Sequence, residues 1–200
     1  MSLRNSRLFN LLWTAKHRLL HALKLREHMR GHPALIERVL GEVLARVPEP
    51  VVIETGCIRS RTEGTLSTVT IAARLAGRGR FYTFELEPAH IAICREICAP
   101  YNQDIHYVQG DSVGNLSRLS GAGELDRIDY AFFDSVNDGG HIFREFQTVE
   151  DRFPAGSVVM VDDVLWGAKG TKIKPYLEGS PDWDTELHNI ENGILIARRR

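Results

Sequence analysis

Short apolar runs and amphipathic segments alternate along most of the chain. The first run, Val51-Val52-Ile53, has no polar alternation, which is typical of a parallel strand buried on both faces, and Glu54-Thr55-Gly56 ends it. Residues 66–76 then carry apolar side chains at helical spacing, with Thr65 as the expected N-cap and Gly77 just beyond the last turn. A strand, a glycine turn and a helix N-terminus in this order form the ligand-binding crevice of doubly wound α/β sheets.

The alternation continues toward the C-terminus. We predict further strands at residues 81–85, 105–108, 128–133 and 157–161. Helices are expected between them, one from Pro88 to just before Pro100 and another over residues 142–153. Two apolar segments then flank Asn192-Gly193, which is a strong hairpin signal. The predicted fold is therefore α/β: a Rossmann-like, doubly wound, mostly parallel seven-stranded sheet with a C-terminal antiparallel hairpin.

The N-terminal part of the chain is different, because it predicts helices without strands. Residues 4–30 combine a leucine stripe with a basic face, and residues 34–47 form a second amphipathic segment. Such a helix could contact a membrane surface or RNA, but an apolar stripe is more often covered by protein, either the main domain or a second subunit. We therefore divide the chain into an N-terminal helical appendage (1–47) and a main domain (48–200), and we leave a homodimer through the N-terminal helices open.

Length, composition and charge narrow the class of protein. The chain has 200 residues, 43% of them hydrophobic and 26% charged, which fits one globular domain with a substantial core. A formal net charge of −1 provides no general attraction to nucleic acid or to anionic membranes, although local patches are still possible, and we expect no nucleic acid as a partner. The apolar runs all fall short of the roughly 18 residues of a membrane span.

The cysteines and the N-terminal histidines suggest no special chemistry. Cys57, Cys94 and Cys98 are interpreted as buried free thiols of a reducing cytosol rather than a redox or metal pair, and we expect a cytoplasmic protein. His28 and His32 have the i, i+4 spacing of a metal pair, but we interpret them as surface histidines because acidic and cysteine neighbours are missing.

Acidic residues mark the ends of the predicted parallel strands. Glu54, Glu85, Asp134 and Asp162 each stand at a strand end, and Asp111 follows the third strand closely. The carboxyl ends of parallel strands lie at one edge of a sheet, so we expect these acids to converge on one crevice. Several acids in one place suggest a ligand with hydroxyls, amines or a cation.

With these residues in place, the chain from about 51 to 198 resembles the class I S-adenosylmethionine-dependent methyltransferases, and especially their small-molecule O-methyltransferases of the catechol O-methyltransferase type. The resemblance implies that Glu54 and Gly56 wrap the methionine part of S-adenosylmethionine and that Glu85 binds both ribose hydroxyls. It also implies that Asp111 meets the adenine amine, with Ser112 beside it, and we count Asp134 among both the cofactor contacts and the catalytic residues. The first loop departs from the family pattern, since seven residues, including Arg59 and Arg61, separate Gly56 from Gly64.

A second resemblance concerns a metal. In the metal-dependent members of the branch, an aspartate after strand four and an aspartate-asparagine pair after strand five hold Mg²⁺, and Asp134, Asp162 and Asp163 fall on those positions. Hard oxygen ligands suit Mg²⁺, which would lower the pKa of the acceptor hydroxyl. Asp163 replaces the asparagine and adds a negative charge. The other interpretation is that these aspartates orient substrate or main chain.

A general base is also required, because methyl transfer to oxygen is helped by deprotonation. The metal-dependent relatives use a lysine in the loop after strand four, whereas residues 135–140 contain none. His141, at the expected start of a helix and supported by Asp138, is the candidate base; it could equally serve only to orient the loop. Trp166 and Trp183 could line the acceptor pocket or belong to the core.

The sequence therefore predicts an enzyme, an S-adenosylmethionine-dependent methyltransferase acting on a small hydroxylated molecule, with Mg²⁺ as an optional cofactor. One alternative is a cofactor-binding module that has lost catalysis and acts through its N-terminal helices. Another is a nicotinamide-dependent oxidoreductase, although the glycine-rich fingerprint is missing after Gly56.

Overall fold

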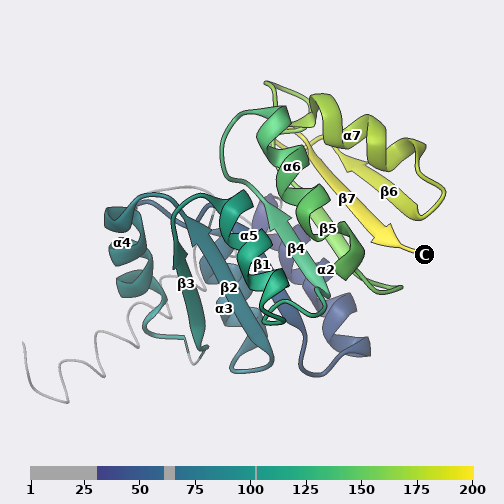
Figure 1. Ribbon diagram of the computed structural model, residues 1–200. Coiled ribbons are helices and arrows are strands. Elements are labelled where there is room, and N and C mark those ends of the chain that lie inside the picture. Colours follow the sequence, from purple (N-terminus) through teal and green to yellow (C-terminus); the bar gives the residue numbers. More distant parts are fainter. Residues whose placement is uncertain (1–30, 61–65, 102) are drawn as a thin grey trace, which may run out of the picture.

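The computed structural model describes residues 31–60, 66–101 and 103–200 (Figure 1). The leucine stripe and basic face of residues 4–30, the N-cap Thr65, and Arg61 and Gly64 of the first loop lie outside the described residues. The proposed homodimer contact falls on the same N-terminal segment. Among the described helices, none has the length and apolar character needed to cross a bilayer.

A seven-stranded sheet forms the centre of the fold, in the order β3-β2-β1-β4-β5-β7-β6. The first five strands are parallel, and β7 runs antiparallel to both β5 and β6, as the hairpin signal at Asn192-Gly193 predicts. The strands are β1 (Val51–Thr55), β2 (Arg80–Glu85), β3 (Ile105–Gln109), β4 (Tyr130–Phe133), β5 (Val158–Val161), β6 (Trp183–His188) and β7 (Ile194–Arg199). The prediction of a doubly wound, mostly parallel α/β sheet with a C-terminal hairpin is confirmed.

Helices cover both faces of this sheet (Figure 1). The described helices are α2 (His32–Arg46), α3 (Ser67–Leu75), α4 (Pro88–Cys98), α5 (Ser112–Gly121), α6 (Gly139–Val149) and α7 (Gly170–Gly179), with a 3-10 turn η2 (Glu150–Arg152) after α6. Helices α2 and α3 pack with one face of the central strands, and α5, α6 and α7 pack with the other. Alternate residues of β1, β4, β5 and β7 belong to the two cores, which explains the continuous apolar runs in these strands.

Helix α7 differs from the sequence-based expectation, whereas α2 agrees with it. Helix α7 is missing from the predicted pattern, because Pro175 stands inside it and its buried side is limited to Gly170, Ile173 and Leu177. Helix α2 packs its apolar side into the same core as β1, β4 and β5. This described part of the predicted appendage therefore rests on the main domain; the division at residue 47 stays a prediction.

Candidate active site

The acids at the strand ends lie at one edge of the sheet. Thr55 pairs with Phe84 of β2 and Phe133 of β4, and Phe133 pairs with Val161 of β5. The residues that follow or close these strands are therefore neighbours across the sheet. Glu54, Glu85, Asp134 and Asp162 therefore lie at one edge of the sheet, as predicted, but they do not all reach one crevice: Glu54 is fully buried and lines neither of the two cavities that open there.

Two adjoining cavities open at this edge. The first, which we call the β2-side cavity, has a volume of about 460 Å³ and includes Glu85, Asp111, Ser112 and His141 in its lining. The second, the acidic cavity, has a volume of about 390 Å³ and includes Asp134, Asp162, Asp163 and Lys169. Gly56, Arg59, Ser135 and Asn137 line both cavities. The two spaces therefore share one wall, made by the loops after β1 and β4.

Gly56 brings these two loops together. Its backbone has a φ of +84°, and a Cβ at this position would overlap the backbone oxygen of Asp134. Only glycine adopts this conformation and allows this approach without strain. The glycine after the first strand therefore allows the loops after β1 and β4 to approach closely enough to form the wall between the cavities.

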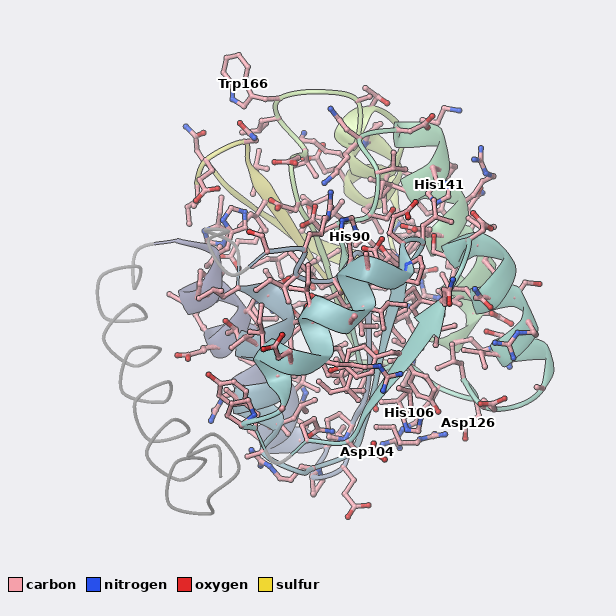
Figure 2. All side chains as sticks on the ribbon, turned by 90° about the vertical axis from the view of Figure 1, so that its left-hand side faces the viewer. His90, Asp104, His106, Asp126, His141 and Trp166 are labelled. Atoms are coloured by element: carbon pink, nitrogen blue, oxygen red, sulfur yellow. The ribbon has the colours of Figure 1, made fainter. Side chains whose placement is uncertain are left out.

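Glu85 presents a held carboxylate to the β2-side cavity. Its Oε1 accepts a hydrogen bond from the backbone N–H of Glu87 at 2.9 Å and lies 3.3 Å from Nδ1 of His90. These two contacts fix the orientation in which the carboxylate of Glu85 can meet a ligand. His90 and His141 lie on the side of the molecule opposite to the end that carries Asp104 and Asp126 (Figure 2).

Asp111 and Ser112 stand at the N-terminus of α5. The carboxylate of Asp111 accepts a hydrogen bond from the backbone N–H of Gly114 at 2.7 Å and so caps the helix. Asp111 and Ser112 both line the β2-side cavity. The structure brings these predicted cofactor residues together with Glu85.

His141 belongs to a hydrogen-bonded network behind this cavity. Its Nε2 lies 3.0 Å from Oγ of Ser112 and 3.2 Å from Oε1 of Glu145, and Ser112 also donates to Glu145. The fully buried Glu145 accepts a further bond from Thr55 at 3.0 Å. The hydrogen bond with Glu145 raises the pKa of His141. His141 does not line the acidic cavity, so its position favours holding Ser112 over acting on an acceptor there.

Glu54 is fully buried beneath the first loop and lines neither cavity. Thr68 and Thr83 donate hydrogen bonds to its Oε2, at 2.7 and 3.0 Å. Burial raises its pKa to about 8, against the hydrogen bonds that favour the charged form. Thr68 Oγ1 also accepts a hydrogen bond from the backbone N–H of Ile58 at 3.1 Å. Through Thr68, Glu54 therefore holds the first loop in place. Its direct contact with a cofactor remains a prediction.

The acidic cavity contains the three aspartates of the predicted metal site. One carboxylate oxygen from each of Asp134, Asp162 and Asp163 lies within 4.8 Å of the others. Asp163 has a φ of +55°, which turns the chain at the end of β5 so that consecutive residues both line the cavity. Burial raises the pKa of Asp134 to about 6, although the ammonium of Lys169 acts in the opposite direction.

Each of these aspartates already has a partner from the chain. Nζ of Lys169 forms an ion pair with Asp134 and lies 3.1 Å from Oδ2 of Asp163. Nε2 of His32 lies 2.6 Å from Oδ1 of Asp162. Burial lowers the pKa of both Lys169 and His32, but their carboxylate neighbours outweigh burial and the net pKa of each is raised.

His32 corrects one prediction, because the histidine interpreted as a surface residue is only 2% exposed. Lys169, which is 3% exposed, was not among the predicted site residues. Glu145 was also missed. The available signal for Lys169 was a lysine in the loop after strand five, close to a cluster of acids that needs positive charge.

Trp166 and Trp183 do not line either cavity. Trp183 is buried against Phe146 and Phe153, with ring centroids 5.7 Å apart in both pairs, so it is a core residue. Trp166 is 68% exposed and projects away from the body of the molecule (Figure 2). The three cysteines are buried and free, as predicted.

A seven-stranded sheet of this order, with a glycine turn after β1 and acids along the carboxyl edge, defines the class: it is the architecture of class I S-adenosylmethionine-dependent methyltransferases, as the resemblance in the sequence implies. A family model described as a methyltransferase domain matches residues 63–164. The chain belongs to this methyltransferase family. The alternative of a nicotinamide-dependent oxidoreductase is set aside.

Solved structures with the same fold include several methyltransferases. An O-methyltransferase from Bacillus cereus, in complex with SAH, is 15% identical; the match covers 93% of this chain and 91% of that chain, with a TM-score of 0.67. Cofactor-bound Rv0187 from MTB is 18% identical, with 91% and 89% coverage and a TM-score of 0.64. The SAH-bound methyltransferase PaMTH1 from Podospora anserina is 18% identical, with 82% and 78% coverage and a TM-score of 0.57. At these identities the likeness concerns the fold. No curated protein matches the chain.

Proposed function

We propose that this methyltransferase transfers a methyl group from S-adenosylmethionine to a hydroxyl of a small molecule. The observation that carries the proposal is the pair of cavities with a common wall, one suited to a nucleoside and the other to a polar acceptor. The similarity in fold to an O-methyltransferase supports oxygen as the acceptor atom.

The β2-side cavity fits the nucleoside part of the donor. The two oxygens of Glu85 match a vicinal diol such as the ribose hydroxyls, and such charge-assisted hydrogen bonds contribute about 1.5–3 kcal/mol each. Asp111 and Ser112, at the start of α5, are within the same cavity and can meet the adenine. Gly56 lines this cavity at the shared wall, beside which the donor's methionine part would lie.

The acidic cavity fits the acceptor. When bound, S-adenosylmethionine supplies a methyl group on a positively charged sulfur. Asp134 follows β4 beside Gly56, and its carboxylate can take the proton of the acceptor hydroxyl. The acceptor oxygen forms the new O–C bond, and the electron pair of the broken C–S bond remains on sulfur. Lys169 and Asp163 hold Asp134 and its surroundings in place for this step.

Metal assistance has weaker support than the sequence suggested. The three carboxylates suit Mg²⁺ as ligand types. However, Lys169 pairs with Asp134 and Asp163, and His32 pairs with Asp162, so a cation could use the cluster only by displacing these contacts. We therefore derive no step through a metal.

Calorimetric titration with S-adenosylmethionine and its demethylated product tests the donor assignment. We expect saturable binding of both, and no binding at millimolar concentration would reject the proposal. A panel of small phenols, catechols and aliphatic alcohols, followed by mass spectrometry, then tests the acceptor class. Binding without turnover across the panel would favour the cofactor-binding module that has lost catalysis.

A further inference from the structure

We propose that Lys169 takes the place of a divalent metal in this enzyme: its ammonium is the built-in cation of the acidic cavity, and it donates a hydrogen bond to the acceptor oxygen. This inference rests on the proposed O-methyl transfer, which it makes more specific. It assigns a catalytic role to a residue that follows β5. The metal-dependent relatives instead have their catalytic lysine in the loop after strand four, where this chain has none.

The charges of the cluster support this role. Asp134 and Asp163 both face the ammonium of Lys169, while Asp162 faces His32. A buried ammonium is costly unless it is paired and hydrogen-bonded, and Lys169 meets this condition through two carboxylates. The lysine and a divalent ion would therefore compete for the carboxylates of Asp134 and Asp163.

The hydrogen-bond capacity of Lys169 leaves one donor for a ligand. An ammonium has three N–H groups, and Asp134 and Asp163 account for two of them among the described residues. Lys169 lines the acidic cavity, so the third N–H can reach an acceptor oxygen there. A donor fixed at the position where an oxygen becomes negative stabilises the transition state more than the ground state.

The backbone around Lys169 is held by its neighbours. The N–H of Ala168 donates to Oδ1 of Asn137 at 2.9 Å, and that of Val164 donates to the carbonyl of Gly193 at 3.0 Å. A Cβ on Gly139 would overlap the carbonyl oxygen of Ala168, so α6 begins directly against the loop that carries the lysine. Contacts with three segments therefore position the ammonium before any ligand binds.

In the reaction, the acceptor hydroxyl gives its proton to Asp134 while its oxygen keeps the hydrogen bond from Lys169. The oxygen lone pair forms the O–CH₃ bond, and the C–S bond breaks with its electron pair on sulfur. The products are the methyl ether, neutral S-adenosylhomocysteine and a proton on Asp134, which solvent removes. Lys169 stays charged throughout, and no oxidant, reductant or metal is needed.

Manganese alone provides a test that needs no acceptor. We would follow Mn²⁺ by electron paramagnetic resonance in wild type, K169Q and the double variant K169Q/D163N. K169Q alone leaves two carboxylates without their cation and could fail to fold. The double variant removes one positive and one negative charge together, so it serves as a second variant that keeps the charge of the cluster closer to that of wild type. We expect no saturable Mn²⁺ binding by wild type and one bound Mn²⁺ in at least one folded variant. Saturable Mn²⁺ binding by wild type would overturn the proposal, and so would the absence of Mn²⁺ binding in every variant that folds.

Turnover with an acceptor from the panel provides the second arm. We expect wild-type turnover to be unaffected by EDTA and kcat of K169Q to fall by about 10²–10³-fold, while its affinity for S-adenosylmethionine stays within about threefold. K174Q is the matched control, because Lys174 lies on α7 and pairs with Glu178 away from the cavity; it should behave as wild type. Loss of wild-type turnover in EDTA, or unchanged turnover in K169Q, would refute the role of Lys169 but leave methyl transfer intact. Failure of wild type to bind S-adenosylmethionine would instead refute the proposed function.

Discussion

The two cavities at the carboxyl edge of the sheet are built in different ways. In the β2-side cavity, the acids are oriented by nearby backbone groups: Glu85 by the N–H of Glu87, and Asp111 by that of Gly114. In the acidic cavity, the charges are held by ion pairs of side chains, among them His32 and Asp162, which are 130 residues apart. Backbone groups thus orient the acids of the first cavity, whereas buried cations set the charge of the second; in the proposed function these are the donor side and the acceptor side.

The largest effect should come from removing the proposed base of the acidic cavity. We expect D134N to lower kcat by about 10²–10⁴-fold, because the amide cannot take the acceptor proton. Its affinity for S-adenosylmethionine, measured by calorimetry, should change by less than about tenfold. D126N, at the opposite end of the molecule (Figure 2), is the control. A large loss of donor affinity with unchanged kcat would show that Asp134 binds the donor instead of acting as the base, and would contradict the assignment of the acidic cavity to the acceptor.

The buried acid behind both cavities should make stability depend on pH. The pKa of Glu54 is about 8 in the folded state against an ordinary 4.5. Below pH 4.5 this carboxyl is protonated in both states; as pH rises from 4.5 to 8 it ionises first in the unfolded state, so folded stability is lost. Urea unfolding at several pH values should show a steeper fall in unfolding free energy for wild type than for E54Q, by a few kcal/mol at about 1.4 kcal/mol per pKa unit. Asp134, whose pKa is also raised by burial, contributes a fall that both proteins share.

The exposed Glu49 provides the control for this experiment. E49Q should follow the pH curve of wild type. Parallel curves for wild type and E54Q would contradict a neutral Glu54 in the folded protein.

The donor side should respond to charge removal at Glu85. In E85Q, an NH₂ group replaces one carboxylate oxygen and the negative charge is lost. We expect the affinity for S-adenosylmethionine to fall by about 10–100-fold, because a hydrogen bond to a charged group contributes about 1.5–3 kcal/mol. At saturating donor, kcat should change little. The exposed Glu124 offers the control variant E124Q. Equal donor affinities of E85Q and wild type would remove Glu85 from the donor site.

The smallest effect is expected at His141. Because its ring contacts Ser112 and Glu145, H141Q should weaken donor binding by less than about tenfold and leave kcat nearly unchanged. Steady-state kinetics with varied donor separates the two parameters. A fall in kcat of about a hundredfold or more would restore His141 as the base, the role that the sequence suggested.

The sequence predicted the fold and the acids at the strand ends better than the partners of those acids, for a physical reason. Continuous apolar runs identify strands buried on both faces, and the topology of a parallel sheet then places Glu85 and Asp134 at one edge. Helix α7 escaped because few of its residues are buried and Pro175 interrupts the pattern. The partners Lys169 and His32 escaped because tertiary packing alone brings them to Asp134 and Asp162.

The bare backbone of Gly56 has one more consequence. Because its Cα carries no side chain, the loops after β1 and β4 approach each other here more closely than any other residue would allow. Even the methyl group of alanine would overlap the backbone oxygen of Asp134 and force these loops apart. In the proposed reaction, the separation of the two loops would set the distance between the methyl donor and the acceptor.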